Sequence, residues 1–294
     1  MFPPIEIIEV GPRDGLQREP TLIATDDKIR MVHQLVDAGI KAIQVTSFVH
    51  PKYVPQMADA EDVCRGIEKC DGVVYSGLVL NMKGLERAHD AGLTHVDMSV
   101  SASDSHSLKN ANRSLNEALS GFGAMVARAR DLGLSVRAGI QCAFGYYEPD
   151  VTQAIVLDIA RQQIALGVES LALADSTGMA NPNQIKTMLN ALQPIVGDVP
   201  IILHLHDTRG MGLANVVSAI EAGCTRFDTA FGGMGGCNFI PEALGNIATE
   251  DTVHMLHEMG YSTGINIAQV AQVSQHLQTL IGQALPGKLY RLVG

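Results

Sequence analysis

The sequence has little aromatic character and no long apolar run. It contains no tryptophan and only 4% aromatic residues, and no apolar stretch approaches the roughly 18 residues that a membrane helix needs. The first residues show no basic segment followed by an apolar one, so we expect no secretory signal. The five cysteines form no CxxC pair, which is typical of a reducing compartment. We therefore expect a cytoplasmic protein without a membrane partner.

Positive charge is also scarce. Lysine and arginine total 21 against 31 acidic residues, for a net charge of −10. A nucleic-acid binder usually presents a basic face, so this balance argues against nucleic acid as a partner. It does not exclude an anionic cofactor, because a local cluster of basic side chains can bind phosphates. With 46% hydrophobic and 18% charged residues, the chain has enough apolar material for a large core.

What the sequence does contain is a regular alternation of short apolar runs and helix-like stretches. The apolar runs predict strands over residues 5–10, 41–48, 73–80, 95–100, 135–142, 170–174, 201–206 and 226–231. The intervening stretches predict helices over residues 26–38, 59–69, 83–91, 115–132, 151–165, 182–193 and 212–221. Glycines at 39, 92, 167 and 223 come just before a strand, as expected for left-handed helix ends.

Eight strands alternating with helices favour an α/β fold with a parallel sheet, namely a closed (β/α)8 TIM barrel with extra C-terminal helices. An open doubly wound sheet is less favoured, because no GxGxxG motif opens a helix after the first strand. We expect residues 1–294 to form a single domain, with 238–294 as a loop and helical cover. Within this cover, Ile267, Val270, Val273, Leu277 and Ile281 follow helical spacing.

The seventh predicted strand runs into two histidines two positions apart. On a strand, alternate side chains share a face, so His204 and His206 point the same way and Asp207 points away. Two imidazoles on one rigid face are the beginning of a metal site, although a strand end with two satisfied histidines is an equal alternative from this pair alone. Asp14, after the first strand, adds a carboxylate at the same end of the barrel. Such a mixed set favours Mg²⁺ or Mn²⁺, while imidazole also suits Zn²⁺, Fe²⁺ or Co²⁺.

Other strand ends are polar as well, and each has a plain structural alternative. Arg13 can form a surface ion pair, Asp14 with Gly15 can form a turn, and Asp175 can cap the next helix. The glycine-rich run 232–236 can be a flexible loop or a phosphate-binding loop, and a single cysteine such as Cys237 is usually inert. These alternatives do not explain why one end of the barrel collects an acid, two histidines, a cysteine and an arginine.

The motifs together resemble 3-hydroxy-3-methylglutaryl-CoA (HMG-CoA) lyase and the wider group of metal-dependent carbon–carbon lyases and synthases. The resemblance runs over nearly the whole chain, in the same order. The motifs that carry it are VGPRDGLQ (10–17), TSFVHPK (46–52), VPQM (54–57), HLHDT (204–208), GGMGGC (232–237) and GN (245–246).

The resemblance implies cleavage of HMG-CoA to acetyl-CoA and acetoacetate, a step in leucine catabolism. It implies that a divalent cation is held by Asp14, His204, His206 and Asn246. Arg13 would stabilise the enolate of the departing acetyl-CoA. Cys237 would serve as the acid/base on a loop that closes over the substrate, and Asp175 would have a catalytic or orienting role. Gln17 and Gln44, like Arg13, would contact the substrate.

Two segments depart from the family pattern. Gln44 stands where the family has glutamate, so this side chain cannot ionise and one negative charge beside the metal is lost. Residues 238–242 (NFIPE) replace a smaller, Gly-rich segment, and the bulk of Phe239 and Ile240 and the charge of Glu242 could reshape the pocket. These departures keep open a related substrate such as citramalyl-CoA. A condensing synthase and a non-enzymatic CoA- or metal-binding barrel are weaker alternatives.

The residues that bind CoA are less well defined by the sequence. Lys52, Lys109 and Arg113 lie near strand-end loops and are candidates for its phosphates, although such side chains are more often solvated surface residues. By analogy with the family we expect a homodimer.

Overall fold

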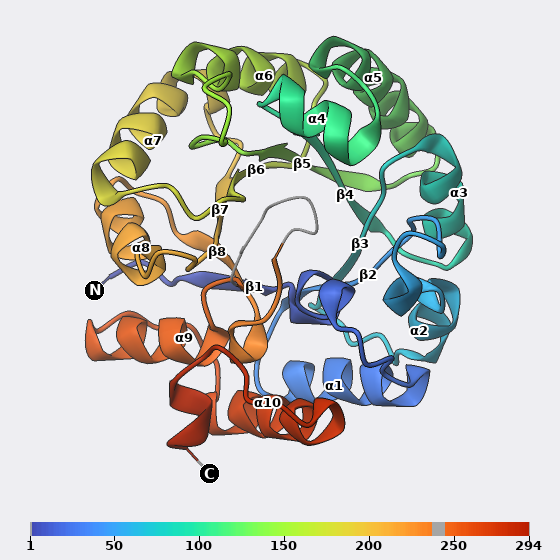
Figure 1. The fold of residues 1–294 in the computed structure, drawn as a ribbon, viewed down its shortest axis with the longest axis vertical. Helices are drawn as coiled ribbons and strands as arrows, with labels where there is room; N and C mark the ends of the chain where they lie inside the picture. Colours follow the sequence, from blue (N-terminus) through green and yellow to red (C-terminus); the bar gives the residue numbers. More distant parts are fainter. Residues whose placement is uncertain (1, 237–244, 294) are drawn as a thin grey trace.

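The structure, a computed structural model, describes residues 2–236 and 245–293. Eight parallel strands form a closed barrel in chain order, and β1 pairs with β8 to complete it (Figure 1). The predicted TIM barrel is therefore confirmed. The strands are β1 Glu6–Glu9, β2 Ala42–Ser47, β3 Val74–Leu78, β4 His95–Ser101, β5 Ser135–Gln141, β6 Ser170–Asp175, β7 Ile201–Leu205 and β8 Arg226–Thr229.

Helices surround the barrel, as Figure 1 shows. They are α1 Thr25–Asp37, α2 Ala60–Gly66, α3 Met82–Asp90, α4 Asp104–Ala111, α5 Leu115–Asp131, α6 Gln153–Ala165, α7 Pro182–Val196, α8 Gly212–Glu221, α9 Thr249–Glu258 and α10 Ile267–Ile281. In the part of the chain described, no helix is both long and apolar enough to span a membrane.

Local sequence explains where the helices begin and end. The four glycines predicted to end helices, Gly39, Gly92, Gly167 and Gly223, all have positive φ angles, which a residue without a Cβ adopts at little cost. At the other end, α7 begins with a reciprocal cap: the Asn181 side chain accepts from the Gln184 amide, and Gln184 accepts from the Asn181 amide.

The C-terminal cover is partly as expected. Helix α10 buries Val270, Val273 and Leu277, which confirms the periodicity read from the sequence, and it packs on α1. Helix α9 was not separately predicted, because its apolar stripe is short. Helix α4 was also missed: its sequence is polar, and it begins at Ser103, whose hydroxyl accepts from the amide of His106 at 3.0 Å.

Strands β7 and β8 are among those that end earlier than expected, and contacts at the mouth of the barrel explain both ends. Strand β7 stops at Leu205, because His206 leaves the parallel ladder and pairs instead, antiparallel, with Asn246. Strand β8 stops at Thr229, because a short helical turn with a left-handed glycine, Gly232, follows at once. Both changes occur where the chain turns over the mouth of the barrel, and both bring residues from β7 and β8 against the segment after residue 245.

Candidate metal centre

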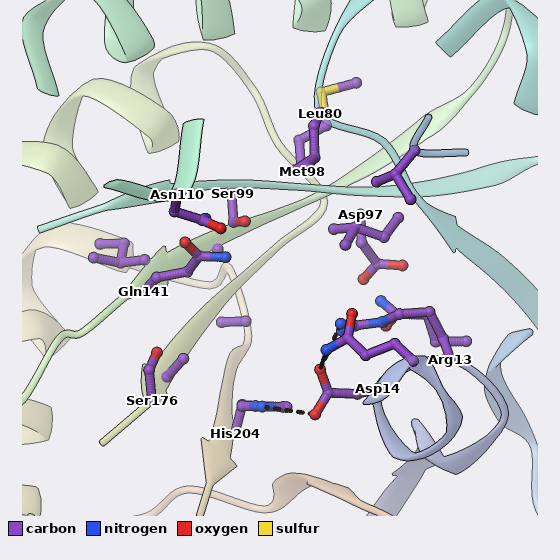
Figure 2. Close-up of a pocket in the computed structure, with 18 of the residues that line it drawn as sticks. Arg13, Asp14, Leu80, Asp97, Met98, Ser99, Asn110, Gln141, Ser176 and His204 are labelled. Carbon is purple, nitrogen blue, oxygen red and sulfur yellow. Dashed lines mark hydrogen bonds and ion pairs between the residues drawn. The ribbon is translucent and has the colours of Figure 1, made fainter. Parts of the chain in front are cut away.

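The segment after β1 forms a single turn of π-helix, Gly11–Gly15. The amides of Arg13, Asp14 and Gly15 all converge on the carbonyl of Val10, at 3.1, 2.7 and 3.3 Å. This tight turn holds the side chains of Arg13 and Asp14 over the barrel, and Figure 2 shows both pointing into the cavity.

The two histidines meet Asp14 there. The Nε2 atoms of His204 and His206 are 3.1 Å apart, and His204 Nε2 lies 3.9 Å from Oδ2 of Asp14. One ligand atom from each of the three residues falls within 4.8 Å of the others. Asp207 points away, as predicted, and accepts a hydrogen bond from the amide of Gly212 at the start of α8. The structure thus brings together three of the four predicted metal ligands in a compact group.

The fourth predicted ligand, Asn246, adjoins Asp14. Its Nδ2 donates to Asp14 Oδ2 at 2.7 Å and to the carbonyl of Met234 at 2.9 Å. Its Oδ1 is buried and has no hydrogen-bond partner among the described residues, which is costly unless another group is bound there. One carboxylate, two imidazoles and one unpartnered amide oxygen form a donor set that fits a divalent cation.

Gly235 allows the loop before this site to approach it closely. A Cβ at this position would lie 2.4 Å from Nδ2 of Asn246 and 3.0 Å from Oδ2 of Asp14, and the residue has φ of +112°. Any side chain here would displace both groups, so glycine is required by the packing of the loop against the metal centre.

The electrostatic environment keeps Asp14 ionised. Burial alone would raise its pKa, but the charges of Arg13, His204 and His206 and the hydrogen bond from Asn246 outweigh it and lower the pKa to about 2. A carboxylate that stays charged at neutral pH is what metal binding requires.

The predicted substrate-contacting residues lie beside this group. Arg13 donates to Asp14 Oδ1 at 2.6 Å through Nη1 and to Oε1 of Gln44 through Nε. Gln17 donates to the same Asp14 oxygen at 2.8 Å. Gln44 therefore holds Arg13 through an uncharged acceptor, and the guanidinium reaches the cavity fixed at two points.

Of the predicted catalytic residues other than Arg13, the structure describes Asp175. Both oxygens of Asp175 accept backbone hydrogen bonds, from Met179 at 2.9 Å and from Ala180 at 3.1 Å. Asp175 therefore shapes the loop between β6 and α7, which is closer to the capping alternative than to contact with substrate. Cys237 and the departing residues Phe239, Ile240 and Glu242 lie outside the described residues.

A cavity of about 670 Å³ opens above the metal centre. Its floor includes Arg13, Asp14, His204 and His206, and its outer part includes Lys109 and Arg113, at and just beyond the end of α4. Two of the three candidate phosphate-binding residues thus line the cavity. Lys52 is exposed on the loop after β2, between the lining residues His50 and Tyr53.

The sequence reasoning missed a chain of buried ions in the barrel interior. Asp228 on β8 accepts a hydrogen bond from Nδ1 of His204 at 3.0 Å, and the same oxygen pairs with Arg137 on β5. Arg137 also pairs with Asp97 on β4 at 3.2 Å. The signal in the sequence was that three charged residues stand within predicted strands. By bonding to Nδ1, Asp228 orients the His204 ring and leaves Nε2 for the metal.

The fold and this site define a (β/α)8 barrel with a group of residues at its mouth, Asp14, His204, His206 and Asn246, whose donor atoms fit a divalent cation. Comparison with known proteins is specific: residues 4–277 match the HMGL-like family model. The chain belongs to the HMGL-like family.

Named relatives agree with this assignment. The chain is 41% identical over 285 residues to the hydroxymethylglutaryl-CoA lyase YngG of Bacillus subtilis, covering 97% of this chain and 95% of that protein. It is 38% identical over 286 residues to the mitochondrial hydroxymethylglutaryl-CoA lyase of Mus musculus, covering 97% and 88%.

Solved structures give the same result. The crystal structure of the Bacillus subtilis HMG-CoA lyase superposes with a TM-score of 0.95 at 41% identity, over 99% of this chain and 98% of that one. An HMG-CoA lyase from Acinetobacter baumannii, solved with coenzyme A and 3-methylmalate, gives 0.94 at 38% identity, over 98% and 94%.

Proposed function

We propose that this protein is a carbon–carbon lyase that cleaves HMG-CoA to acetyl-CoA and acetoacetate. The observation that carries the proposal is the Asp14–His204–His206–Asn246 group beside Arg13 at the floor of a cavity, in a chain whose relatives named above are HMG-CoA lyases. These relatives favour HMG-CoA over the citramalyl-CoA and synthase alternatives.

The metal centre supplies the first requirement of the reaction. A divalent cation bound by these four residues, which we propose to be Mg²⁺ or Mn²⁺, would lower the pKa of a substrate hydroxyl and template its binding. The protein's own contribution is orientation: Asp228 holds His204, and Asn246 and Arg13 hold Asp14. Little reorganisation of the ligands is then needed on binding.

Arg13 supplies the second requirement. When the carbon–carbon bond breaks, the electron pair moves onto the thioester carbonyl and an enolate forms. A guanidinium fixed at the floor of the cavity stabilises that developing charge more than water does. Gln44 helps to position it through a hydrogen bond. A glutamine cannot take up a proton, so in this chain the side chain at position 44 positions Arg13 and does not act as a base.

Cys237 is proposed as the acid that returns a proton to the acetyl carbanion. The support for this role is the resemblance of the GGMGGC motif, together with the position of residue 236, which follows the glycine packed against Asp14 and Asn246. Substitution Cys237→Ser should leave folding and metal binding unchanged and reduce turnover sharply.

Further parts of the proposal concern the setting of the reaction. Lys109 and Arg113 are proposed to bind CoA phosphates, because they line the outer part of the cavity. We also propose that residues 1–294 act as one domain, that the chain forms a homodimer, and that it works in the cytoplasm in leucine catabolism. The cysteine pattern of the sequence supports a reducing compartment.

The decisive experiment measures acetyl-CoA release from HMG-CoA and from citramalyl-CoA, with Mg²⁺, with Mn²⁺ and after chelation. Wild type and Gln44→Glu are compared, with the exposed Gln162→Glu as a matched control. We expect metal-dependent cleavage of HMG-CoA by the wild type. Activity on citramalyl-CoA alone, or only after Gln44→Glu, would show that the chain has kept the machinery and changed its substrate.

A further inference from the structure

Asp97 is a buried carboxylate that the proposed mechanism does not use. It is 5% exposed and lines the cavity together with Arg13 and Asp14. Figure 2 shows its carboxylate directed into the cavity, on the side of the labelled Arg13 and Asp14. Within residues 2–236 and 245–293, neither of its oxygens has a hydrogen-bond partner, and its ionic contact is with Nε of Arg137 at 3.2 Å.

In the chain of buried ions, Asp97 can still accept hydrogen bonds. Arg137 is a single positive charge between two carboxylates, Asp97 and Asp228. Asp228 has a second partner, because Nδ1 of His204 donates to it. Asp97 has no second partner of this kind among the described residues, so two buried oxygens face the cavity with most of their lone pairs unpaired. A buried acceptor of this kind is costly unless a donor binds to it.

The depth of Asp97 indicates which part of a ligand reaches it. Asp97 lies in register with Arg137 on the neighbouring strand, and Asp228 lies in register with His204. Arg137 joins the two pairs, which places Asp97 at the level of the metal centre. Lys109 and Arg113 mark the outer part of the same cavity. A CoA thioester that enters from that side would therefore bring its acyl end to Asp97.

The functional groups of the acyl chain differ in whether they can donate a hydrogen bond to Asp97. The terminal carboxylate of such an acyl group would be repelled by Asp97 and must lie elsewhere in the cavity, and a thioester carbonyl or a methyl group offers no donor. A hydroxyl on the acyl chain is a donor and would satisfy one of the unpaired oxygens. We propose that Asp97 contacts the substrate and accepts a hydrogen bond from the hydroxyl of the 3-hydroxyacyl group, so that it selects hydroxylated acyl-CoA thioesters. This assignment rests on the proposed function.

The experiment compares a hydroxylated substrate with an analogue that lacks only the hydroxyl. For the metal-loaded full chain, kcat/KM is measured for HMG-CoA, and the inhibition constant is measured for 3-methylglutaryl-CoA. For Asp97→Asn we expect kcat/KM to fall about 10- to 100-fold, the range for a hydrogen bond to a charged group, and the inhibition constant to change less than about threefold. Asp90→Asn, at the exposed end of α3, is the matched control.

The outcomes separate this assignment from the proposed function. Equal losses for both ligands would make Asp97 a structural partner of Arg137 and overturn the assignment, as would no loss for either. If Asp97→Asn does not fold, Asp97→Glu keeps the ion pair but moves the carboxylate, and the same selective loss is expected. A wild type that binds 3-methylglutaryl-CoA but does not cleave HMG-CoA would overturn the proposed function, and this assignment with it.

Discussion

The side-chain nitrogen of Asn246 lies 2.7 Å from Oδ2 of Asp14, although 232 positions separate the two residues. Because this nitrogen is also held by the carbonyl of Met234, the orientation of the amide is fixed and Oδ1 remains as the acceptor. Asp14, in turn, receives Arg13 and Gln17 on its other oxygen. The centre is thus preorganised by hydrogen bonds to the ligands themselves.

Removal of one imidazole should weaken metal binding. We expect His206→Ala to lower the affinity for Mn²⁺ at least tenfold and to reduce turnover with it, because two of the four donors are imidazoles and the His206 side chain is buried. Calorimetric titration with Mn²⁺ measures this. His254→Ala, on the exposed face of α9, should bind the ion like the wild type, and unchanged affinity in His206→Ala would remove His206 from the site.

Removal of the guanidinium should affect the chemical step. We expect Arg13→Gln to lower kcat about 100- to 1,000-fold, as for the loss of one preorganised group that faces developing charge. KM should change much less. Steady-state kinetics with HMG-CoA and saturating metal test this, with the exposed Arg161→Gln as control. A rise in KM at constant kcat would instead give Arg13 a role in ground-state binding.

Substitution of Asp175 should affect the stability of the protein more than its turnover. Replacement by Asn leaves one of the two backbone amides, Met179 or Ala180, without its acceptor, so we expect a loss of about 1–3 kcal/mol in the free energy of unfolding. Urea unfolding measures it, and Asp198→Asn in the exposed loop before β7 is the control. Turnover should fall far less than for Arg13→Gln, and an equal fall would return Asp175 to the catalytic residues.

Glu9 makes stability depend on pH. Burial raises the pKa of its carboxyl to about 8 from an ordinary 4.5, although Thr249 and the amides of Gly11 and Phe231 donate to it. Between about pH 5 and 8 the folded state keeps this proton and the unfolded state does not, so stability should fall as pH rises through that window.

The test of this dependence is Glu9→Gln, which removes the titrating group. We expect its urea-unfolding free energy to fall less steeply from pH 5 to 8 than that of the wild type. Glu250, whose pKa is also raised by burial, should preserve part of the slope. The exposed Glu258→Gln should match the wild type. An unchanged slope in Glu9→Gln would mean that Glu9 is ionised throughout this range in the folded protein.

Much of the fold was predictable from the sequence, because it follows from local patterns. Buried strands of a parallel barrel are continuous apolar runs, and helix ends carry glycine, so both signals are short-range. The end of β7 was not predictable, since His206 leaves the strand only because Asn246, 40 positions later, pairs with it. Helix α4 has a polar sequence, and no apolar stripe indicates it.

The site residues that stand in sequence motifs were predictable. The charged residues in the interior of the barrel were not. Asp14 and the two histidines stand in recognisable motifs at strand ends. Asp97, Arg137 and Asp228 lie within strands, and a charged residue there is normally assumed to face outward. Their inward direction depends on the closure of the barrel, which brings β5 and β8 across from one another. Periodicity along one strand cannot show this.

The proposed metal ligands come from distant parts of the sequence. Asp14 follows the first strand, His204 lies on the seventh and His206 directly after it, and Asn246 lies beyond the eighth. During synthesis the growing chain therefore has no complete centre until nearly all of it has left the ribosome. In the folded protein, these four residues connect the segment after β1 to the segments that follow β7 and β8. A cation bound there would stabilise the barrel where its first and last strands pair.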